Sequence, residues 1–142
     1  MIMTQEDKEL LLRDLCARLP YHVKASYYGA EEERETWDVI EGITLDGYVD
    51  IGQYSLHIEG IKPYLFPISS MTREQLFEVQ EILGKNEIEV DDGFLHIINS
   101  DRNTITYLEL LALLEWFYKN HFDIDNIIPK GLAIDATNLN IY

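Results

Sequence analysis

The sequence is poor in residues on which several classes of protein depend. Of its 142 residues, one is cysteine (Cys16) and four are histidine. A single cysteine excludes an internal disulfide framework and a zinc site built from cysteines. Because Cys16 falls on the apolar face of an expected helix, we predict that its thiol is buried.

Long apolar runs are missing as well. None approaches the ~18 residues of a membrane-spanning helix. The first residues also lack the basic region followed by an apolar one that marks a secretion signal. These features predict a soluble, cytoplasmic protein in a reducing compartment, with no membrane partner.

Basic residues are scarce. Lys and Arg number 11 against 26 Asp and Glu, which gives a formal net charge of −15. Contacts with phosphate groups need Lys or Arg, so direct binding to nucleic acid or to an anionic membrane is disfavoured. The segment 31–50 has a single basic residue, Arg34, against Glu31, Glu32, Glu33, Glu35, Asp38, Glu41, Asp46 and Asp50.

The familiar motifs of catalysis and cofactor binding do not occur. The sequence has no GxGxxG, P-loop, GxSxG, HExxH or DxDxDG pattern. A compact group, His121, Asp123 and Asp125, offers ligands for a divalent metal. The same residues fit a structural role, with a histidine at a helix end and aspartates capping the next turn. We favour the structural role and predict no cofactor and no catalytic residue.

A second polar pair stands on an expected strand. His57 and Glu59 lie on its polar face and could act together as an acid–base pair. Together with the metal candidates, this pair keeps open the alternative of a small metal-dependent hydrolase.

The stretch 59–72 divides the chain into two kinds of pattern. Pro63 and Pro67 exclude a helix over residues 61–68 and make a poor central strand. The stretch is nevertheless apolar, so we expect a buried extended crossover that brings a helix back onto a sheet. With 142 residues and 46% hydrophobic composition, we expect one domain over residues 1–142.

Three stretches of the chain carry the signals of a helix. Thr4 is expected to cap a first helix that Pro20 stops, and Thr72 with Gln75 forms a capping box for a helix that ends at Gly84. A third helix is expected over residues 104–120. The apolar arc of the first helix comprises Leu11, Leu12, Leu15, Cys16 and Leu19, and excludes Arg13, Asp14 and Arg18.

Alternating patterns predict strands over residues 21–28, 37–45, 48–51 and 54–58, and a hairpin over residues 88–98. Trp37, Val39, Ile43 and Leu45 are expected on one face. A three-residue loop with Leu45 opposite Val49 would keep the aliphatic residues together. We therefore expect an α+β fold, in which a small antiparallel sheet (a meander plus a hairpin) packs against about three helices.

The third helix is apolar on two sides. Tyr107, Leu110, Leu111, Leu114, Phe117 and Tyr118 form one broad face, whereas Leu113 and Trp116 project from the opposite face. A helix that is apolar on both sides is buried on both sides. Trp116 is then covered either by the last part of the chain or by a second copy or another protein.

Three stretches carry a resemblance to a known group of proteins. They are LLLRDLCARLPY at residues 10–21, KPYLFPISSMT at residues 62–72, and NHFD at residues 120–123 followed by KGLAID at residues 130–135. In these stretches the chain resembles an uncharacterised family of small acidic proteins encoded by gut Bacteroidetes and their phages and prophages. The chain departs from the family at two places. Members look similar to one another in having arginine where this chain has Phe66, and Tyr-Arg where it has Ile124-Asp125. The resemblance implies an accessory gene of a mobile element.

These observations lead to three functional hypotheses. The first is a non-catalytic accessory protein that binds another protein, or a second copy as a homodimer, through Tyr64 and Phe66 or through Leu113 and Trp116. The second is a nucleic-acid mimic whose acidic surface occupies the basic site of a DNA- or RNA-binding protein. The third is the hydrolase.

Overall fold

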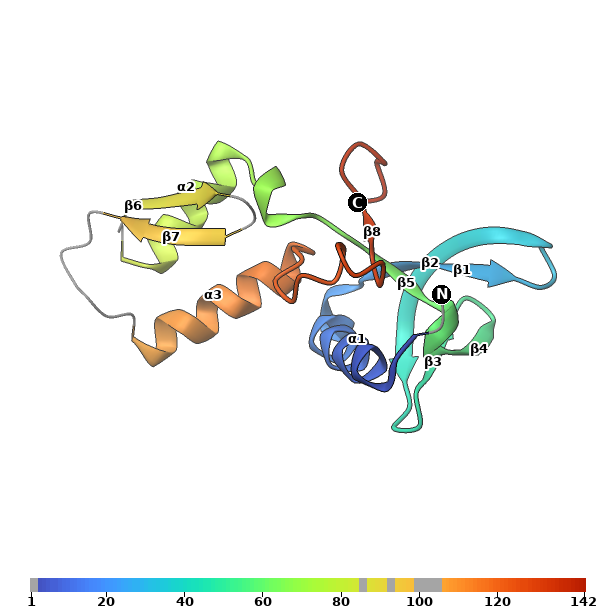
Figure 1. Cartoon of the computed structure of the whole chain (residues 1–142). Coiled ribbons are helices and arrows are strands. Elements are labelled where there is room, and N and C mark those ends of the chain that lie inside the picture. Colours follow the sequence, from blue (N-terminus) through green and yellow to red (C-terminus); the bar gives the residue numbers. More distant parts are fainter. Residues whose placement is uncertain (1–2, 85–86, 92–93, 99–105) are drawn as a thin grey trace.

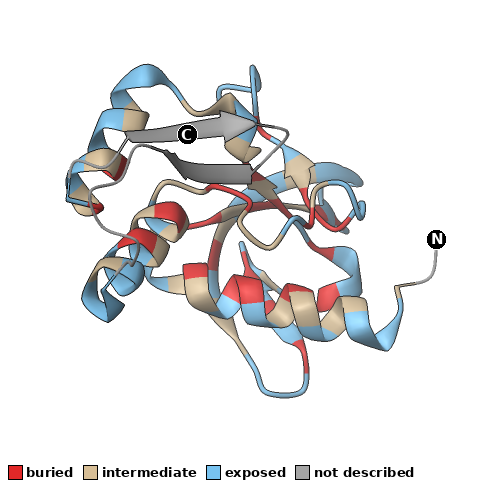
Figure 2. Ribbon diagram, turned by 60° about the vertical axis from the view of Figure 1, so that its left-hand side comes forward, coloured by how far each residue is buried: buried red, intermediate tan, exposed pale blue. Residues whose placement is uncertain are grey.

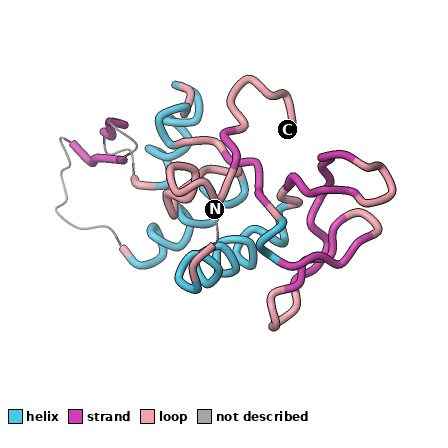
Figure 3. Tube along the Cα trace, turned by 45° about the vertical axis from the view of Figure 1, so that its right-hand side comes forward, coloured by secondary structure: helices cyan, strands magenta, loops and turns pink. Residues whose placement is uncertain are grey.

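The computed structural model describes residues 3–84, 87–91, 94–98 and 106–142. Within them the α+β class is confirmed, since three α-helices accompany a six-stranded sheet and a two-stranded hairpin. Figure 1 shows α1 beside the sheet, with α2 and α3 on the other side of α1 from strands β1 to β4. Helices and sheet therefore occupy different parts of the molecule, as the tube in Figure 3 also shows.

Helix α1 (Gln5–Arg18) begins at Thr4, whose side chain accepts a hydrogen bond from the backbone N–H of Asp7. The expected cap is thus confirmed. The buried face is rotated from the expected arc, because Asp14 and Arg18 are buried while Cys16 is exposed. The prediction of a buried thiol is therefore wrong. The two charged residues can be buried because they satisfy each other, as described below.

The large sheet has the strand order β4-β3-β2-β1-β5-β8 among the described residues. Its first four strands form an antiparallel meander: β1 (Lys24–Gly29), β2 (Arg34–Ile43), β3 (Tyr48–Ile51) and β4 (Tyr54–His57). Strand β5 (Lys62–Leu65) pairs antiparallel with β1, and the short β8 (Ile134–Asp135) pairs parallel with β5. The sheet is therefore mixed, and its one parallel pair brings distant parts of the sequence together.

The turn between β2 and β3 differs from the expected register. Ile43 lies opposite Val49, so the three loop residues are 45–47 and Leu45 is fully exposed. A bulge between Ile40 and Gly42 shifts the faces of β2, which buries Ile40 and leaves Trp37 exposed. The prediction that Trp37, Val39, Ile43 and Leu45 lie together on one face is therefore wrong. The reasoning from burial still holds, because Ile40, Val49 and Ile51 are buried together.

The proline-containing stretch is buried as expected, since Ile61, Pro63 and Leu65 are all buried. It is nevertheless an internal strand, β5, which the prolines were expected to disfavour. The pairing with β1 covers Lys62 and Pro63, and the pairing with β8 covers Tyr64 and Leu65. Because each ladder is two residues long and β8 begins to pair after Pro63, the missing N–H of this proline interrupts little.

The 3-10 turn Ile68–Ser70 leads from β5 into helix α2 (Arg73–Ile82). Thr72 and Gln75 form the expected capping box, and Gly84 has the positive φ of 71° expected of a residue that ends a helix. The hairpin of β6 (Glu87–Asp91) and β7 (Phe94–Ile98) is confirmed as an antiparallel pair. Its turn residues and Thr104 lie outside the described residues. Helix α3 (Tyr107–Lys119) begins at Thr106.

Two clusters of buried apolar residues occupy the described part of the chain. The larger lies between α1 and the sheet and includes Leu11, Leu15, Val23, Ile40, Ile51 and Leu65. The smaller lies between α2 and α3 and comprises Val79, Leu83, Leu113, Phe117 and Phe122. Figure 2 shows buried and exposed residues interleaved along the helices. Whether the clusters form one cooperative domain stays a prediction.

Candidate functional site

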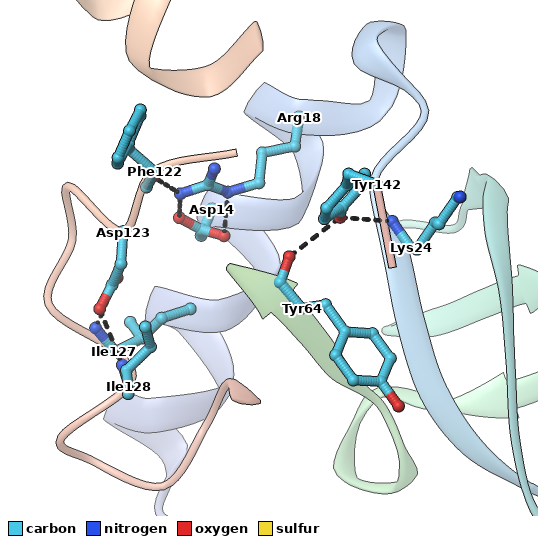
Figure 4. A network of polar contacts seen from close by, with 9 residues as sticks. All are labelled: Asp14, Arg18, Lys24, Tyr64, Phe122, Asp123, Ile127, Ile128 and Tyr142. Atoms are coloured by element: carbon cyan, nitrogen blue, oxygen red, sulfur yellow. Dashed lines mark hydrogen bonds and ion pairs between the residues drawn. The ribbon is translucent and has the colours of Figure 1, made fainter. Parts of the chain in front are cut away.

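A buried ion pair lies where α1 meets the loop after α3. The guanidinium of Arg18 donates to both carboxylate oxygens of Asp14, from Nε at 2.7 Å and from Nη2 at 2.9 Å. Nη2 also donates to the carbonyl oxygen of Phe122 at 2.7 Å, and both charged side chains are inaccessible to solvent. Figure 4 shows these contacts. Since Phe122 belongs to the smaller core cluster, Arg18 connects the two clusters.

Burial controls the electrostatics of this pair. It raises the pKa of Asp14 to about 6, although the bond to Arg18 and its charge act in the opposite direction. The carboxyl of Asp125 contributes in the same direction as burial. The guanidinium carbon of Arg18 lies 5.0 Å from the ring centre of Tyr118, whose pKa is raised chiefly by burial. These groups neutralise and cover one another, which indicates a structural role.

Two of the three candidate metal ligands, Asp123 and His121, have contacts within the chain. The carboxylate of Asp123 accepts from the backbone N–H groups of Ile127 at 2.8 Å and Ile128 at 2.9 Å, so it caps the following turn. Burial raises the pKa of Asp123, whereas these two bonds lower it. Across the described ranges, no group of three or more His, Cys, Asp or Glu residues is placed to hold a metal ion. The structural interpretation of Asp123 therefore agrees with its observed contacts.

His121 lies against an aromatic ring. Its imidazole stacks on Tyr142, with ring centres 3.8 Å apart and planes inclined by 11°. Burial and the positive charges of Arg18 and Lys24 lower the pKa of His121 to about 4, so the ring is neutral at pH 7. His121 follows the end of α3, and its backbone has a positive φ of 64° that does not continue the helix.

The expected acid–base pair is divided between two partners. His57 accepts a hydrogen bond at Nδ1 from the backbone N–H of Glu59, at 3.4 Å. The carboxylate of Glu59 forms an ion pair with Lys8 of α1, and this bond lowers the pKa of Glu59. A shallow pocket beside them is lined by Lys8, Leu12, Asp46 and His57. The carboxylate of Glu59, expected to act with His57, is therefore paired with the ammonium group of Lys8.

The residues proposed for partner binding lie largely within the chain. Leu113 is buried against α2. Trp116 stacks on Phe122 with planes inclined by 13°, and its indole N–H donates to Glu78 of α2 at 2.9 Å. Of the two alternatives for Trp116, the chain itself provides the cover, through α2 and the loop after α3. Leu113 is buried and Trp116 is partly covered within the chain, and partner binding through these two residues stays a prediction.

Tyr64 and Phe66 are partly buried for a similar reason. The backbone oxygen of Tyr64 accepts from the hydroxyl of Tyr142 at 2.9 Å. The ring of Phe66 packs against Phe122 and Tyr142, with centres 6.1 and 5.8 Å away. Backbone bonds from Phe66 N–H to His121 and from Asp123 N–H to Phe66 hold the two segments side by side. Tyr64 and Phe66 therefore connect β5 to the loop after α3 and to Tyr142.

The exposed apolar surface lies instead on the first two turns of α3. Tyr107, Leu108, Leu110 and Leu111 are 73%, 76%, 44% and 45% exposed, and we call these four residues the α3 face. Helical spacing places Tyr107, Leu110 and Leu111 in one stripe, with Leu108 beside them. Three of the four belong to the face that the sequence predicted as core. The apolar pattern identified these residues, but it could not show which side of the helix α2 would cover.

Two of the clustered glutamates are tied to the turn between β3 and β4. Glu31 accepts from Gln53 at 2.8 Å, and Glu32 accepts from the hydroxyl of Tyr54, also at 2.8 Å. Burial raises the pKa of Tyr27, and Asp38 and Glu32 act in the same direction. At least these two carboxylates therefore have a role in connecting strands, which a mimic of a phosphate backbone would not require.

Comparison with known proteins adds no relative to this description. No protein-family model, curated protein or solved structure matches the chain. Among the helices in the described part of the chain, none is both long and apolar enough to cross a membrane. The interpretation of function therefore depends on the geometry.

Proposed function

We propose that the chain is a non-catalytic accessory protein that binds another protein through the α3 face. The observation that carries this proposal is the exposure of Tyr107, Leu108, Leu110 and Leu111 on adjacent turns of one helix. Contiguous apolar patches of this kind on a soluble protein commonly mark interaction sites. A groove in a partner can accept such a helix through residues spaced three and four apart.

The physical benefit of docking is the removal of apolar surface from water. Each square ångström of buried apolar surface contributes roughly 25 cal/mol, before the costs of association are subtracted. The net charge of −15 opposes self-association and favours a partner with basic residues around an apolar site.

The test replaces Leu108 and Leu111 with glutamate in one variant. Because both side chains are exposed, we expect the stability to change by no more than about 0.5 kcal/mol per site. We expect affinity capture from a lysate of the source organism to lose the proteins that the unmodified chain retains. Quantitative mass spectrometry of the captured proteins measures this loss.

A matched control comes from α2. Phe77 is 61% exposed on that helix, so Phe77→Glu adds one glutamate to an apolar position outside the α3 face and is compared with Leu108→Glu and Leu111→Glu made singly as well as together. The proposal requires the Phe77→Glu chain to retain the same proteins as the unmodified chain. Retention by all of these chains, or equal loss from the α2 and α3 variants, would show that the α3 face is not the docking surface.

The acidic alternative predicts a different dependence on salt. Binding of a mimic to a basic site would weaken steeply between 50 and 200 mM salt, as phosphate contacts do at roughly these concentrations. Docking through apolar side chains, with basic residues of the partner only around the site, should weaken much less over that range. The bonds from Glu31 and Glu32 to the turn between β3 and β4 make the mimic the less favoured proposal.

A further inference from the structure

The ladder between β1 and β5 has a gap that is filled by a side chain. Ala25 pairs with Pro63 and Ser26 with Lys62, so continued pairing would next bring Lys24 opposite Tyr64. The hydroxyl of Tyr142 occupies this place. It accepts from the backbone N–H of Lys24 at 2.9 Å and donates to the backbone oxygen of Tyr64 at 2.9 Å. Figure 4 shows this bridge.

The groups around the Tyr142 ring complete a socket, which we define by Lys24, Tyr64, Phe66 and His121. His121 stacks on one face of the ring at 3.8 Å, and the centre of Phe66 lies 5.8 Å away. The ammonium group of Lys24 lies 5.4 Å from the ring centre. Since the pKa of His121 is lowered to about 4, the stacked imidazole carries no charge at pH 7.

The socket selects a particular chemistry. One atom must accept from an N–H and donate to a C=O, while a flat ring fills the space between His121 and Phe66. A phenol does both. A phenylalanine ring would leave a backbone donor and acceptor unpaired, and a water molecule would supply the bonds without the ring.

Between Ala136 and Ile141, the segment that leads to Tyr142 makes few contacts with the sheet. The side chains of residues 137–140 are exposed. Ala136 N–H bonds to Leu65, but the next bonds, from Thr137 to Asp135 and from Leu139 to Ala136, are local. Beyond them, contacts with the sheet come from Tyr142 and from Lys24 Nζ, which donates to Ile141 at 2.7 Å. A segment with few buried contacts opens at low cost.

We propose that this socket is a binding site for the tyrosine side chain of an extended segment of another protein, and that the chain fills it with its own Tyr142. A partner's tyrosine enters when residues 137–142 leave. Occupancy by Tyr142 lowers the apparent affinity for the partner by the fraction of time that the socket is free. This site is independent of the α3 face.

The test uses the full chain with Tyr142→Gly, which empties the socket, and a synthetic peptide, acetyl-Asn-Leu-Asn-Ile-Tyr, which matches residues 138–142. Circular dichroism first confirms that the variant is folded. We expect the peptide to bind and to return the amide resonance of Lys24 to its position in the unmodified chain. The same peptide ending in phenylalanine should bind about tenfold more weakly, because it loses two hydrogen bonds.

Displacement is tested on the unmodified chain. An excess of the tyrosine peptide should shift the resonances of Ile141 and Tyr142 toward those of a free segment. Failure of the tyrosine peptide to bind the glycine variant, or equal binding by the phenylalanine peptide, would overturn the proposed specificity. Unchanged Ile141 and Tyr142 resonances at saturating peptide would overturn displacement.

A second variant covers the case in which Tyr142→Gly does not fold. Tyr142→Phe keeps the ring and removes the hydroxyl, so hydrogen exchange at the Lys24 amide should become faster. If the amide stays as protected as in the unmodified chain, β1 and β5 have closed directly onto each other. No phenol site then exists, and the proposal fails.

Discussion

At the residue scale, the buried pair of Asp14 and Arg18 is the feature most removed from the sequence pattern. Both residues lie outside the arc of Leu11, Leu12, Leu15, Cys16 and Leu19 that the sequence pattern predicts as the apolar face of α1. Their spacing of four residues was the signal that they could pair on one face of a helix. The sequence could not reveal that the oxygen of Phe122 would accept a further hydrogen bond from Arg18, because this contact spans 104 positions.

Replacing Arg18 with methionine tests the importance of this pair. The change leaves the carboxylate of Asp14 buried without its counterion and removes the donor to Phe122. Breaking one side of a buried pair typically costs about 3–5 kcal/mol, and we expect a loss of this size in urea unfolding.

The double variant Asp14→Leu, Arg18→Met is the control. It removes both charges, so most of the lost stability should return, with a residual cost of about 1–3 kcal/mol for the unpaired oxygen of Phe122. A double variant as unstable as the single one would show that the isolated charge does not cause the loss.

The lowered pKa of His121 predicts how stability depends on pH. The folded pKa is about 4 and the ordinary value is 6.5, so between these values the unfolded chain binds the proton more readily. The contribution of neutral His121 is therefore complete above pH 6.5 and is lost as the pH falls toward 4. Charged groups that act on it are Arg18, Lys24 and His22.

His121→Asn removes the titration and keeps a residue that tolerates the positive φ at this position. We expect the stability of the unmodified chain relative to this variant to decrease as the pH is lowered from 6.5 to 4, measured by urea unfolding at several pH values. Asp14, whose pKa is raised to about 6, has the opposite dependence but is present in both chains. A difference that does not vary with pH would contradict the burial of His121.

At the element scale, helix starts could be read from the sequence and helix orientation could not. The caps at Thr4 and Thr72 depend on residues three positions apart, so local pattern was sufficient. The covered faces of α1 and α3 depend on packing with distant segments. Strand β2 shows the same limit, since its bulge at Ile40 responds to the pairing with β3.

Thr72→Ala tests the cap of α2. It removes the bond from the backbone N–H of Gln75 to the threonine hydroxyl, 3.2 Å long. Loss of such a cap typically costs about 1 kcal/mol, and we expect thermal or urea unfolding to show a decrease of that size. Thr137→Ala, at an exposed position outside the helices, should cost less. Equal effects of the two changes would show that the cap contributes little.

At the scale of the whole molecule, Arg18 of α1 contacts Phe122 of the smaller apolar cluster, and Phe66 after β5 forms a bridge with Phe122. The α+β class and the buried proline stretch followed from composition, alternation and proline position. The parallel pairing of β5 with β8 joins residues about half the chain apart, so no local pattern indicated it. The surface left uncovered depends on how these parts pack.

That surface decides the function proposed for the chain. Packing of α2 against Leu113 and Trp116 leaves Tyr107, Leu108, Leu110 and Leu111 outside, on a molecule of net charge −15. A net charge of this size favours repulsion between copies of the molecule. The sequence-based candidates Leu113 and Trp116 and the α3 face proposed here therefore lie on the same helix but on different sides of it.

Site-specific photo-cross-linking tests this claim most directly. A benzophenone amino acid at position 111 lies on the α3 face, and the same group at position 77 lies on the exposed side of α2. In a lysate of the source organism, we predict that position 111 forms a cross-link to a discrete partner protein and that position 77 does not. Cross-linking to the same protein from both positions, or from position 77 alone, would contradict the account.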